Sequence, residues 1–331
     1  MAEIVKITSI EQIDLVGRQG GIAPLGRREF ILHAPDAHYA VLDSGGMLAG
    51  RCSVWWNSVP LYPGEQVGLV GHYEVRDRET AAVLLAHAGG EMIRQGCTLA
   101  IGPMDGNIWR RYRFITRRGT EPPFFLEPDN PDDYPGHFLS AGFTPLARYY
   151  SNLDPDLGWS LAGAAMLEEK LKKEGVTFRS LKMDDFGKEL ERIYELSVSG
   201  FLNNFLYTPI DRNEFLEMYS KVQAFVIPEF VWFAEQADSP VGFIFAVPDM
   251  LRVGQGEPSD TLIFKSMAVL PAWNGKRIGS FFIAIVTEQA RKKGFRRSIH
   301  ALMHEDNRSR LLSGHHGVEI REYTLFSWRL N

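Results

Sequence analysis

Glycines and cations meet at one point of the sequence, in residues 265–280, where an apolar strand would end and a helix begin. Such a junction directs several backbone N–H groups and the positive end of the helix dipole at one spot, which suits an anion. Gly275 and Gly279 have no Cβ and would let a ligand approach the backbone, while Lys276 and Arg277 add positive charge. The segment therefore predicts a diphosphate site. The alternative, in which both glycines only form a tight turn and a cap, stays open.

The elements that would hold this site follow from hydrophobic periodicity. Ile278, Phe281, Phe282 and Ile285 recur at helical spacing and predict one buried stripe on the helix after the junction. The second half of the chain predicts helices over 185–202, 211–224 and 279–293, strands over 230–235, 241–247, 262–270 and 297–303, and a closing segment that runs to residue 328.

The first half shows the same order of elements. Leu84, Leu85, Ala88 and Met92 predict a helix that Gly96 ends. The predicted elements are strands over 39–42, 51–56 and 67–73, a helix over 79–95, a strand over 97–101, a proline-rich region, strands near 143–152 and a linker over 154–160.

This repeated order predicts an internal duplication. The 331 residues are more than one hydrophobic core usually supports, so two domains are expected. We expect an α/β fold with a mixed α+β sheet, divided into an N-terminal domain at 1–155 and a C-terminal domain at 156–331.

Composition and charge exclude several classes of protein. The chain is 45% hydrophobic and 23% charged, as folded globular proteins are. The net charge is −5 and the sequence has no long Lys/Arg runs, so it does not indicate a surface that binds nucleic acid or an anionic membrane. The longest apolar stretch, 281–286, is far below the ~20 residues that cross a bilayer.

The N-terminus and the cysteines favour a cytoplasmic location. Glu3 and Lys6 interrupt the apolar core that a secretion signal would need. Cys52 and Cys97 are isolated in sequence and cannot build a zinc knuckle or a disulfide framework, which fits a reducing compartment. The adjacent His315 and His316 would point apart, so no metal site is predicted.

The first half has its own strand-to-helix junction at 74–80, which differs in chemistry. It has no glycine, and it carries the carboxylates Asp77 and Glu79. Carboxylates suit a helix N-terminus by themselves but would repel a diphosphate. We therefore expect the first domain to lack cofactor binding.

The junction at 265–280 resembles the signature of the GNAT acetyltransferase superfamily, which is a strand, Val-x-Pro, then Arg/Gln-x-x-Gly-x-Gly/Ala at the start of a helix. Val269, Pro271 and Gly279 match this signature, whereas Asn274 replaces Arg/Gln and Arg277 replaces the first glycine. A second family mark, a strand followed by Asn, a small residue and then Gly-Phe, is matched in part within 303–318. Segments 102–104, 121–135 and 247–249, with Pro228, resemble a group of two-domain bacterial GNAT proteins, so the likeness covers nearly the whole chain.

This resemblance implies two tandem GNAT-like acyl-CoA N-acyltransferase domains, of which the second binds acetyl-CoA or another acyl-CoA. The backbone of Met267 and Val269 would pair with the pantetheine arm, because the strands splay apart there. Asn307 and Ser309 would line the adenosine or pantetheine side. The diphosphate would be held by Asn274, Gly275, Lys276, Arg277, Ile278, Gly279 and Ser280.

An amine acceptor must lose a proton, because an amine with a pKa of about 10.4 is protonated at pH 7. His300, Leu302 and His304 would share one face of their strand by period two. We name His304, at the strand's end, as the candidate base. Glu305 and Asp306 are alternative candidates for the base. It is also open whether His300 is a core residue and whether His304 only caps a loop.

The resemblance also implies a tyrosine acid on the helix after the Asn. Ser313 or Gly314 stands near that position, so Tyr323, further along, is the candidate that remains. A buried strand residue is the other reading of Tyr323.

Acceptors in the resembled family lie against the loop between the first two helices. Here that loop contains Asn203, Asn204, Phe205 and Tyr207, which could supply hydrogen bonds within an apolar wall. A helix cap at Asn203 followed by core aromatics is an equal alternative.

The sequence thus favours an acyl-CoA-dependent N-acyltransferase, acting on a primary amine of a small molecule or peptide. The alternative is a non-catalytic CoA-binding or sensory protein with a degenerate site. An oligomer stays open, and neither nucleic acid nor a membrane is expected as a partner.

Overall fold

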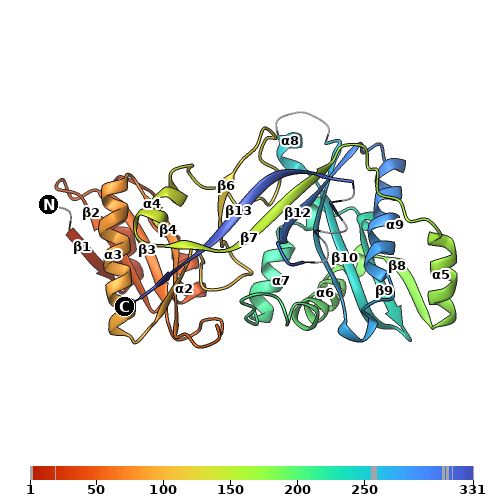
Figure 1. Cartoon of the computed structure of the whole chain (residues 1–331), viewed down its shortest axis with the longest axis horizontal. Helices are drawn as coiled ribbons and strands as arrows, with labels where there is room; N and C mark the ends of the chain where they lie inside the picture. Colours follow the sequence, from red (N-terminus) through yellow and green to blue (C-terminus); the bar gives the residue numbers. More distant parts are fainter. Residues whose placement is uncertain are drawn as a thin grey trace.

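The computed structural model describes residues 3–18, 20–254, 259–307, 310, 313–314 and 316–330. In this part the strands join one mixed sheet, and helices pack along it (Figure 1). The α/β class with a mixed sheet that the sequence predicts is therefore confirmed. No described helix is long and apolar enough to cross a membrane.

The first half of the chain supplies seven of the described strands. Its elements are β1 (Glu3–Ile7), α1 (Ile10–Arg18), α2 (Arg27–His33), β2 (Ala37–Leu42), β3 (Leu48–Trp55), β4 (Val67–Val75), α3 (Arg78–Arg94), β5 (Leu99–Gly102), β6 (Phe114–Arg117), α4 (Tyr134–Ser140) and β7 (Thr144–Asp154).

The second half follows a similar order. Its elements are α5 (Ala164–Lys173), β8 (Val176–Ser180), α6 (Phe186–Gly200), α7 (Arg212–Ser220), β9 (Val231–Gln236), β10 (Ser239–Pro248), α8 (Met250–Gly254), β11 (Thr261–Val269), α9 (Ile278–Lys292), β12 (Arg297–His304) and β13 (Val318–Arg329). Single turns of 3-10 helix lie at Met183–Asp185, Gln223–Phe225, Pro228–Phe230 and Pro271–Trp273.

The final strands of the two halves are exchanged. The sheet runs β1-β2-β3-β4-β5-β13-β7-β12-β11-β10-β9-β8, with β6 paired to β13 at the side. β13 pairs with β5 of the first half, and β7 pairs with β12 of the second. Figure 1 shows β7 and β13 running together across the middle of the molecule, so that the C-terminus ends beside α3. A boundary near residue 155 divides the chain but does not divide the sheet.

Two hydrophobic clusters cover opposite faces of the second half. On one face, Phe215 of α7 and Leu190 of α6 pack against Phe243 and Phe245 of β10. On the other face α9 buries its apolar stripe, in which Phe282 belongs to the same cluster as Ile244 and Phe264. Side chains of alternating strand positions thus face different helices, as period two requires.

The segment predicted as a linker over 154–160 is tied to the fold. Leu157 and Trp159 are buried, and Asp154 accepts a hydrogen bond from the backbone N–H of Gly158 at 2.9 Å. The sequence prediction omitted α5 and β8, which follow directly and pack against α9 and β9. These elements are short, with ten residues in α5 and five in β8.

We expect that neither half folds alone, because each half lacks the strand that the other contributes. Residues 156–331 expressed without β7 would leave β12 and β13 without their shared neighbour, with unpaired backbone groups at both edges. Size-exclusion chromatography should show aggregation, and circular dichroism should show no cooperative thermal transition.

The control for this experiment is co-expression of 1–155 with 156–331, which should yield a 1:1 complex. A monomeric fragment of 156–331 that unfolds cooperatively and binds acetyl-CoA as tightly as the whole chain would contradict the need for strand exchange.

Candidate functional site

The central feature of the site is a gap between two parallel strands. β11 and β12 pair from Thr261 opposite Arg297 only as far as Phe264 opposite His300. Beyond that point each strand continues without the other. β11 also contains a bulge here. Phe245 of β10 pairs with Ser266, and the next residue, Ala246, pairs with Phe264. Lys265 therefore has no partner residue on β10.

A cleft of about 530 Å³ lies on the α9 side of this gap. The structure gathers most of the residues that the sequence predicts for the anion site along its wall. Those residues are Met267, Val269, Asn274, Gly275, Arg277, Ile278, Gly279, Ser280 and Asn307. Two predicted residues are not part of it: Lys276 turns away to form an ion pair with Glu174, and Ser309 lies outside the described residues.

The N-terminus of α9 opens on this cleft without a side-chain cap. Arg277 occupies the cap position with φ 64°, and its side chain makes no capping hydrogen bond. The first N–H groups of a helix have no partner within the helix, so here they are available to a ligand. Gly275 has φ 82°, a conformation that glycine adopts without strain. A Cβ on Gly279 would lie 3.2 Å from the Met267 methyl carbon.

A second cavity, of about 830 Å³, lies on the α6 and α7 side of the gap. Met218 and Tyr219 line it from the second half, while Trp109, Arg113 and Glu127 line it from the first. The two cavities share six lining residues at the strand gap, namely Phe201, Asn204, Lys265, Ser266, Ala301 and Leu302. The gap between β11 and β12 therefore connects a cleft on one face of the sheet with a cavity on the other.

The loop predicted to contact an acceptor contributes one of its four named residues to these cavities. Asn204 lines both. Asn203 is exposed, the ring of Phe205 packs against Tyr62 and His304, and the Tyr207 hydroxyl donates to the Val198 carbonyl at 3.1 Å. Phe201, one turn earlier in the chain, also lines both cavities and was not predicted.

The expectation that His300, Leu302 and His304 share one face is wrong, because β12 is irregular at this point. Its register with β7 shifts between His300 and Met303, and Leu302 has φ 61°. A bulge of this kind turns the following side chains. His300 faces the first cleft, where burial lowers its pKa to about 4.

His304 lines neither cavity among the described residues. Its ring packs edge-on against Tyr149 at 5.0 Å between centroids, and its Nδ1 accepts a hydrogen bond from the Asp306 N–H at 3.1 Å. Its Nε2 is buried without a hydrogen-bond partner in the described part of the chain. Burial lowers the pKa of His304, so the ring is neutral at pH 7.

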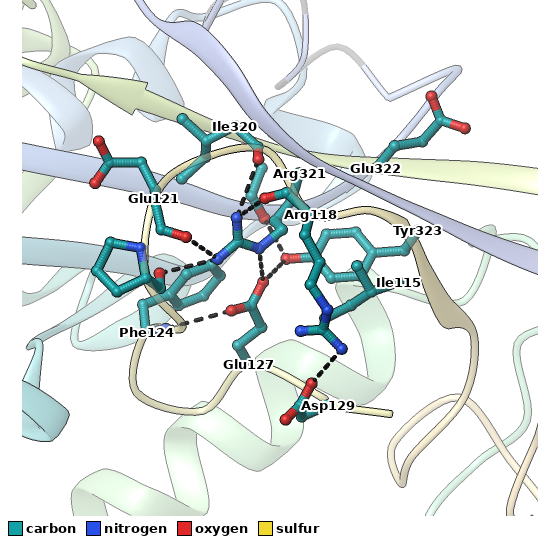
Figure 2. A network of polar contacts seen from close by, with 12 residues as sticks. Ile115, Arg118, Glu121, Phe124, Glu127, Asp129, Ile320, Arg321, Glu322 and Tyr323 are labelled. Carbon is teal, nitrogen blue, oxygen red and sulfur yellow. Dashed lines mark hydrogen bonds and ion pairs between the residues drawn. The ribbon is translucent and has the colours of Figure 1, made fainter. Parts of the chain in front are cut away.

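Tyr323 belongs to a buried network rather than to a cavity wall (Figure 2). Its hydroxyl donates to Glu127 Oε1 at 2.5 Å and contacts the Ser151 hydroxyl at 3.1 Å. Ser151 in turn accepts from the backbone N–H of Leu302 at 3.0 Å, which places Tyr323 two hydrogen bonds behind the strand gap. Burial, and then the Glu127 carboxylate, raise the pKa of Tyr323, so the hydroxyl stays protonated.

Arg321 completes this network. Its Nε donates to Glu127 Oε1 at 3.0 Å, and its Nη2 donates to the carbonyls of Glu121 and Pro122 at 2.7 and 2.9 Å (Figure 2). Since Arg321 and Tyr323 lie on β13 and Glu127 lies in the first half, the network fixes the first-half loop against the exchanged strand.

The equivalent junction in the first half is closed by its own chain. The Asp77 carboxylate accepts from the N–H of Thr80 at 2.8 Å and so caps α3. β4 and β5 also separate after Leu69, but there the N–H of Met104 donates to the Val70 carbonyl at 2.8 Å. A Cβ on Gly71 would overlap the backbone of Met104, which shows how closely the chain fills this gap.

The described residues contain no group of three His, Cys, Asp or Glu side chains that could hold a metal ion. Cys52 and Cys97 are buried as free thiols, and burial raises the pKa of both. Thiols of this kind are poor nucleophiles, because the thiolate is the reactive form.

Residues 190–312, which run from α6 past β12, match the acetyltransferase (GNAT) family. The match covers the strand gap, the α9 junction and the described part of the first cleft. The second half of the chain therefore contains a region of the acetyltransferase (GNAT) family.

Solved structures with low sequence identity share the fold. A GCN5-related N-acetyltransferase from Anabaena variabilis aligns with all of this chain and 73% of its own, with a TM-score of 0.56 and 11% identity. A tandem GNAT protein from the clavulanic acid biosynthesis pathway aligns with all of this chain and 99% of its own, with a TM-score of 0.50 and 11% identity.

A relative in sequence is the protein YghO of Escherichia coli strain K12. It is 24% identical over 220 residues, which are 63% of this chain and 54% of that protein. The chain thus aligns with about half the length of this relative.

The candidate base predicts a particular pH dependence. If His304 takes the acceptor's proton, turnover should fall only below about pH 6.5, because burial lowers its pKa and the neutral form persists above that value. Replacing His304 by Ala should reduce kcat ~100-fold and remove this acid limb, while acetyl-CoA affinity stays the same. Steady-state rates between pH 5 and 9 measure both effects.

The matched control is His87→Ala, which changes a histidine on α3 that lines none of the cavities described above. A kcat of His304→Ala equal to that of the wild type would exclude His304 as the base.

For Tyr323, the network predicts a structural effect. Replacing Tyr323 by Phe removes the hydrogen bonds to Glu127 and Ser151, and we expect the free energy of unfolding to fall by about 1–2 kcal/mol. Since Tyr323 lines neither cavity, turnover should stay within ~3-fold of the wild type. A loss of turnover without a loss of stability, measured by denaturant unfolding, would instead support an acid role.

Proposed function

We propose that this protein transfers an acyl group from acyl-CoA to a primary amine. The observation that carries the proposal is the meeting of two cavities, from opposite faces of the sheet, at the gap between β11 and β12. Two reactants can approach each other through such a gap without sharing an entrance, and holding them in place is a large part of catalysis.

In this proposal the acyl-CoA occupies the cleft on the α9 side. The uncapped N-terminus of α9 offers backbone N–H groups and the positive end of the helix dipole to the diphosphate. Arg277 adds a positive charge beside them. The free edge of β11 at Met267 and Val269 can pair with the amide groups of the pantetheine arm, which would direct the thioester toward Lys265 and Ser266.

The amine acceptor then enters from the α6 and α7 side. Its cavity is lined by aromatic and apolar side chains, among them Trp109, Tyr219 and Phe245, and by charged side chains that can orient a ligand. The first half would contribute a wall of this cavity and no acyl-CoA site, since Asp77 caps α3 and Met104 fills the first-half gap.

A second function, binding acyl-CoA without transfer, is favoured by two observations. Arg277 stands in place of a motif glycine, and neither His304 nor Tyr323 lines the cavities. Turnover of acetyl-CoA with a panel of amines, followed by release of free thiol, separates the two functions. Binding by calorimetry with no thiol release above the acceptor-free rate would favour the sensory or CoA-binding role.

If only the second half of the chain binds acyl-CoA, one acyl-CoA molecule should bind per chain. Isothermal calorimetry with acetyl-CoA should give a stoichiometry near one. Replacing Gly279 by Asp should weaken binding at least ~100-fold, because it places a carboxylate where the helix N-terminus would meet the diphosphate. Glu79→Gln, at the equivalent junction of the first half, should leave the affinity unchanged.

The control Gly279→Ala separates charge from volume. Alanine adds the same Cβ near Met267, whose flexible side chain can move aside, and it adds no charge. We expect a loss at least ~10-fold smaller than for aspartate. A stoichiometry near two, or full affinity in a folded Gly279→Asp variant, would overturn the placement of the diphosphate and the division between the halves.

A further inference from the structure

Three of the six charged side chains that line the cavity on the α6 and α7 side form ion pairs, and a fourth, Arg111, is exposed and donates to the Asp129 carbonyl. Arg110 forms a two-point ion pair with Glu214, with N–O distances of 2.6 and 2.8 Å. Glu127 is held by Arg321, and Asp129 forms an ion pair with Arg118 at 2.8 Å. The Glu127 and Asp129 carboxylates of this cavity wall are therefore already engaged in ion pairs with arginines.

Arg113 is a buried cation without such a partner. Its side chain lies between aromatic rings, with the guanidinium carbon 4.1 Å from the ring centres of both Tyr112 and Tyr149. Only 8% of the residue is exposed. Its Nε and Nη1 have no hydrogen-bond partner, and no carboxylate lies within ion-pair distance, among the described residues. The aromatic rings fix the plane of the guanidinium but supply no acceptor oxygen.

Lys265 is the second such cation. The bulge in β11 places it at the strand gap, where it lines both cavities. Its Nζ donates to the Leu126 carbonyl at 3.2 Å, and the described part of the chain offers it no ion pair. Burial first, and the positive charge of Arg113 second, lower its pKa to about 8, so it remains mostly protonated at pH 7.

Two cations near each other at a partly buried site are costly unless an anion accompanies them. We propose that Arg113 and Lys265 form a subsite for a carboxylate, and that the acceptor is an amine that also carries a carboxylate. This proposal rests on the proposed acyl transfer and adds the chemical class of the acceptor. A carboxylate gains charge-assisted hydrogen bonds from a guanidinium and an ammonium, which are stronger than hydrogen bonds between neutral groups.

The position of Lys265 limits the shape of this acceptor. Because Lys265 lies at the gap where the thioester would emerge, the carboxylate binds within a few bonds of the reacting amine. The wall also includes aromatic and apolar side chains, among them Trp109, Tyr219 and Phe245. A short amino acid with an apolar side chain combines these properties.

The test compares acids with amides of the same carbon skeleton, at equal concentrations of the neutral amine. Phenylalanine, leucine and 4-aminobutyrate are each paired with their amides, and both acetyl transfer and calorimetric binding in the presence of CoA are measured. For at least one pair, kcat/KM and affinity should be ~10- to 100-fold higher for the acid, which corresponds to a hydrogen bond to a charged group. No preference for the acid in any pair, by either readout, overturns the subsite.

Variants then assign the preference to the two cations. Lys265→Met should lower the ratio of kcat/KM for the acid to kcat/KM for the amide at least ~10-fold, by raising the KM for the acid. Lys265→Arg should retain most of the preference for the acid. Arg113→Gln should act in the same direction, and Lys188→Gln, an exposed lysine on α6, should leave the ratio unchanged. Thermal unfolding of each variant checks folding, and Lys265→Met alone decides the outcome if Arg113→Gln does not fold. A ratio that survives Lys265→Met would contradict the proposal.

The two readouts separate this proposal from the proposed function. Binding of the acid over the amide without acetyl transfer would refute the transferase and leave the carboxylate subsite standing. Acetylation of both members of each pair at equal rates would support the transferase and refute the subsite.

Discussion

The exchange of β7 and β13 is the constraint on which the rest of the structure depends. Because each half gives its last strand to the other, the hydrogen-bond ladder runs without interruption from β1 to β8, and its order reads alike from both ends. β12 pairs with β7 on one side and separates from β11 on the other. The strand gap in the second half is therefore supported by a strand from the first. The first half cannot move independently of the site, and its loops can supply a fixed wall for the cavity on the α6 and α7 side.

Two halves with the same order of elements differ in chemistry at one junction. In the first half, a side-chain carboxylate satisfies the helix N-terminus and the backbone after β5 occupies the strand gap. In the second half the cap position has no side-chain acceptor, and the strands remain apart. The fold allows a ligand at both junctions, and a few residues decide which one stays open. Loops of the first half that follow β5 bring Trp109 and Glu127 to the cavity on the α6 and α7 side.

The sequence predicted the elements of this fold well where apolar residues recur over many positions, as on α3 and α9. Glycine and charge are local signals, and the residues proposed for the α9 junction, except Lys276, lie along one cleft. The period of two residues gave the wrong orientation for the His304 side chain, because a bulge at Leu302 turns β12. No residue type at that position indicates such a bulge. The strand exchange was also invisible, since both halves end in a similar strand and pairing depends on the whole sheet. Arg113 and Lys265 were missed for the same reason: they lie 152 positions apart in numbering and meet only through the tertiary fold.

The distribution of buried charge connects the fold with the proposed chemistry. Around β13 a buried guanidinium, a buried carboxylate and a tyrosine hydroxyl satisfy one another, because Arg321 and Tyr323 share Glu127. In this arrangement the Glu127 carboxylate, which lies near Lys265, is already bonded to Arg321 and Tyr323. Arg113 and Lys265 thus keep their charge beside the strand gap. Among the described residues, Arg113 and Lys265 lie without an ion pair where two cavities meet, so a bound anion there would offset the cost of burying them.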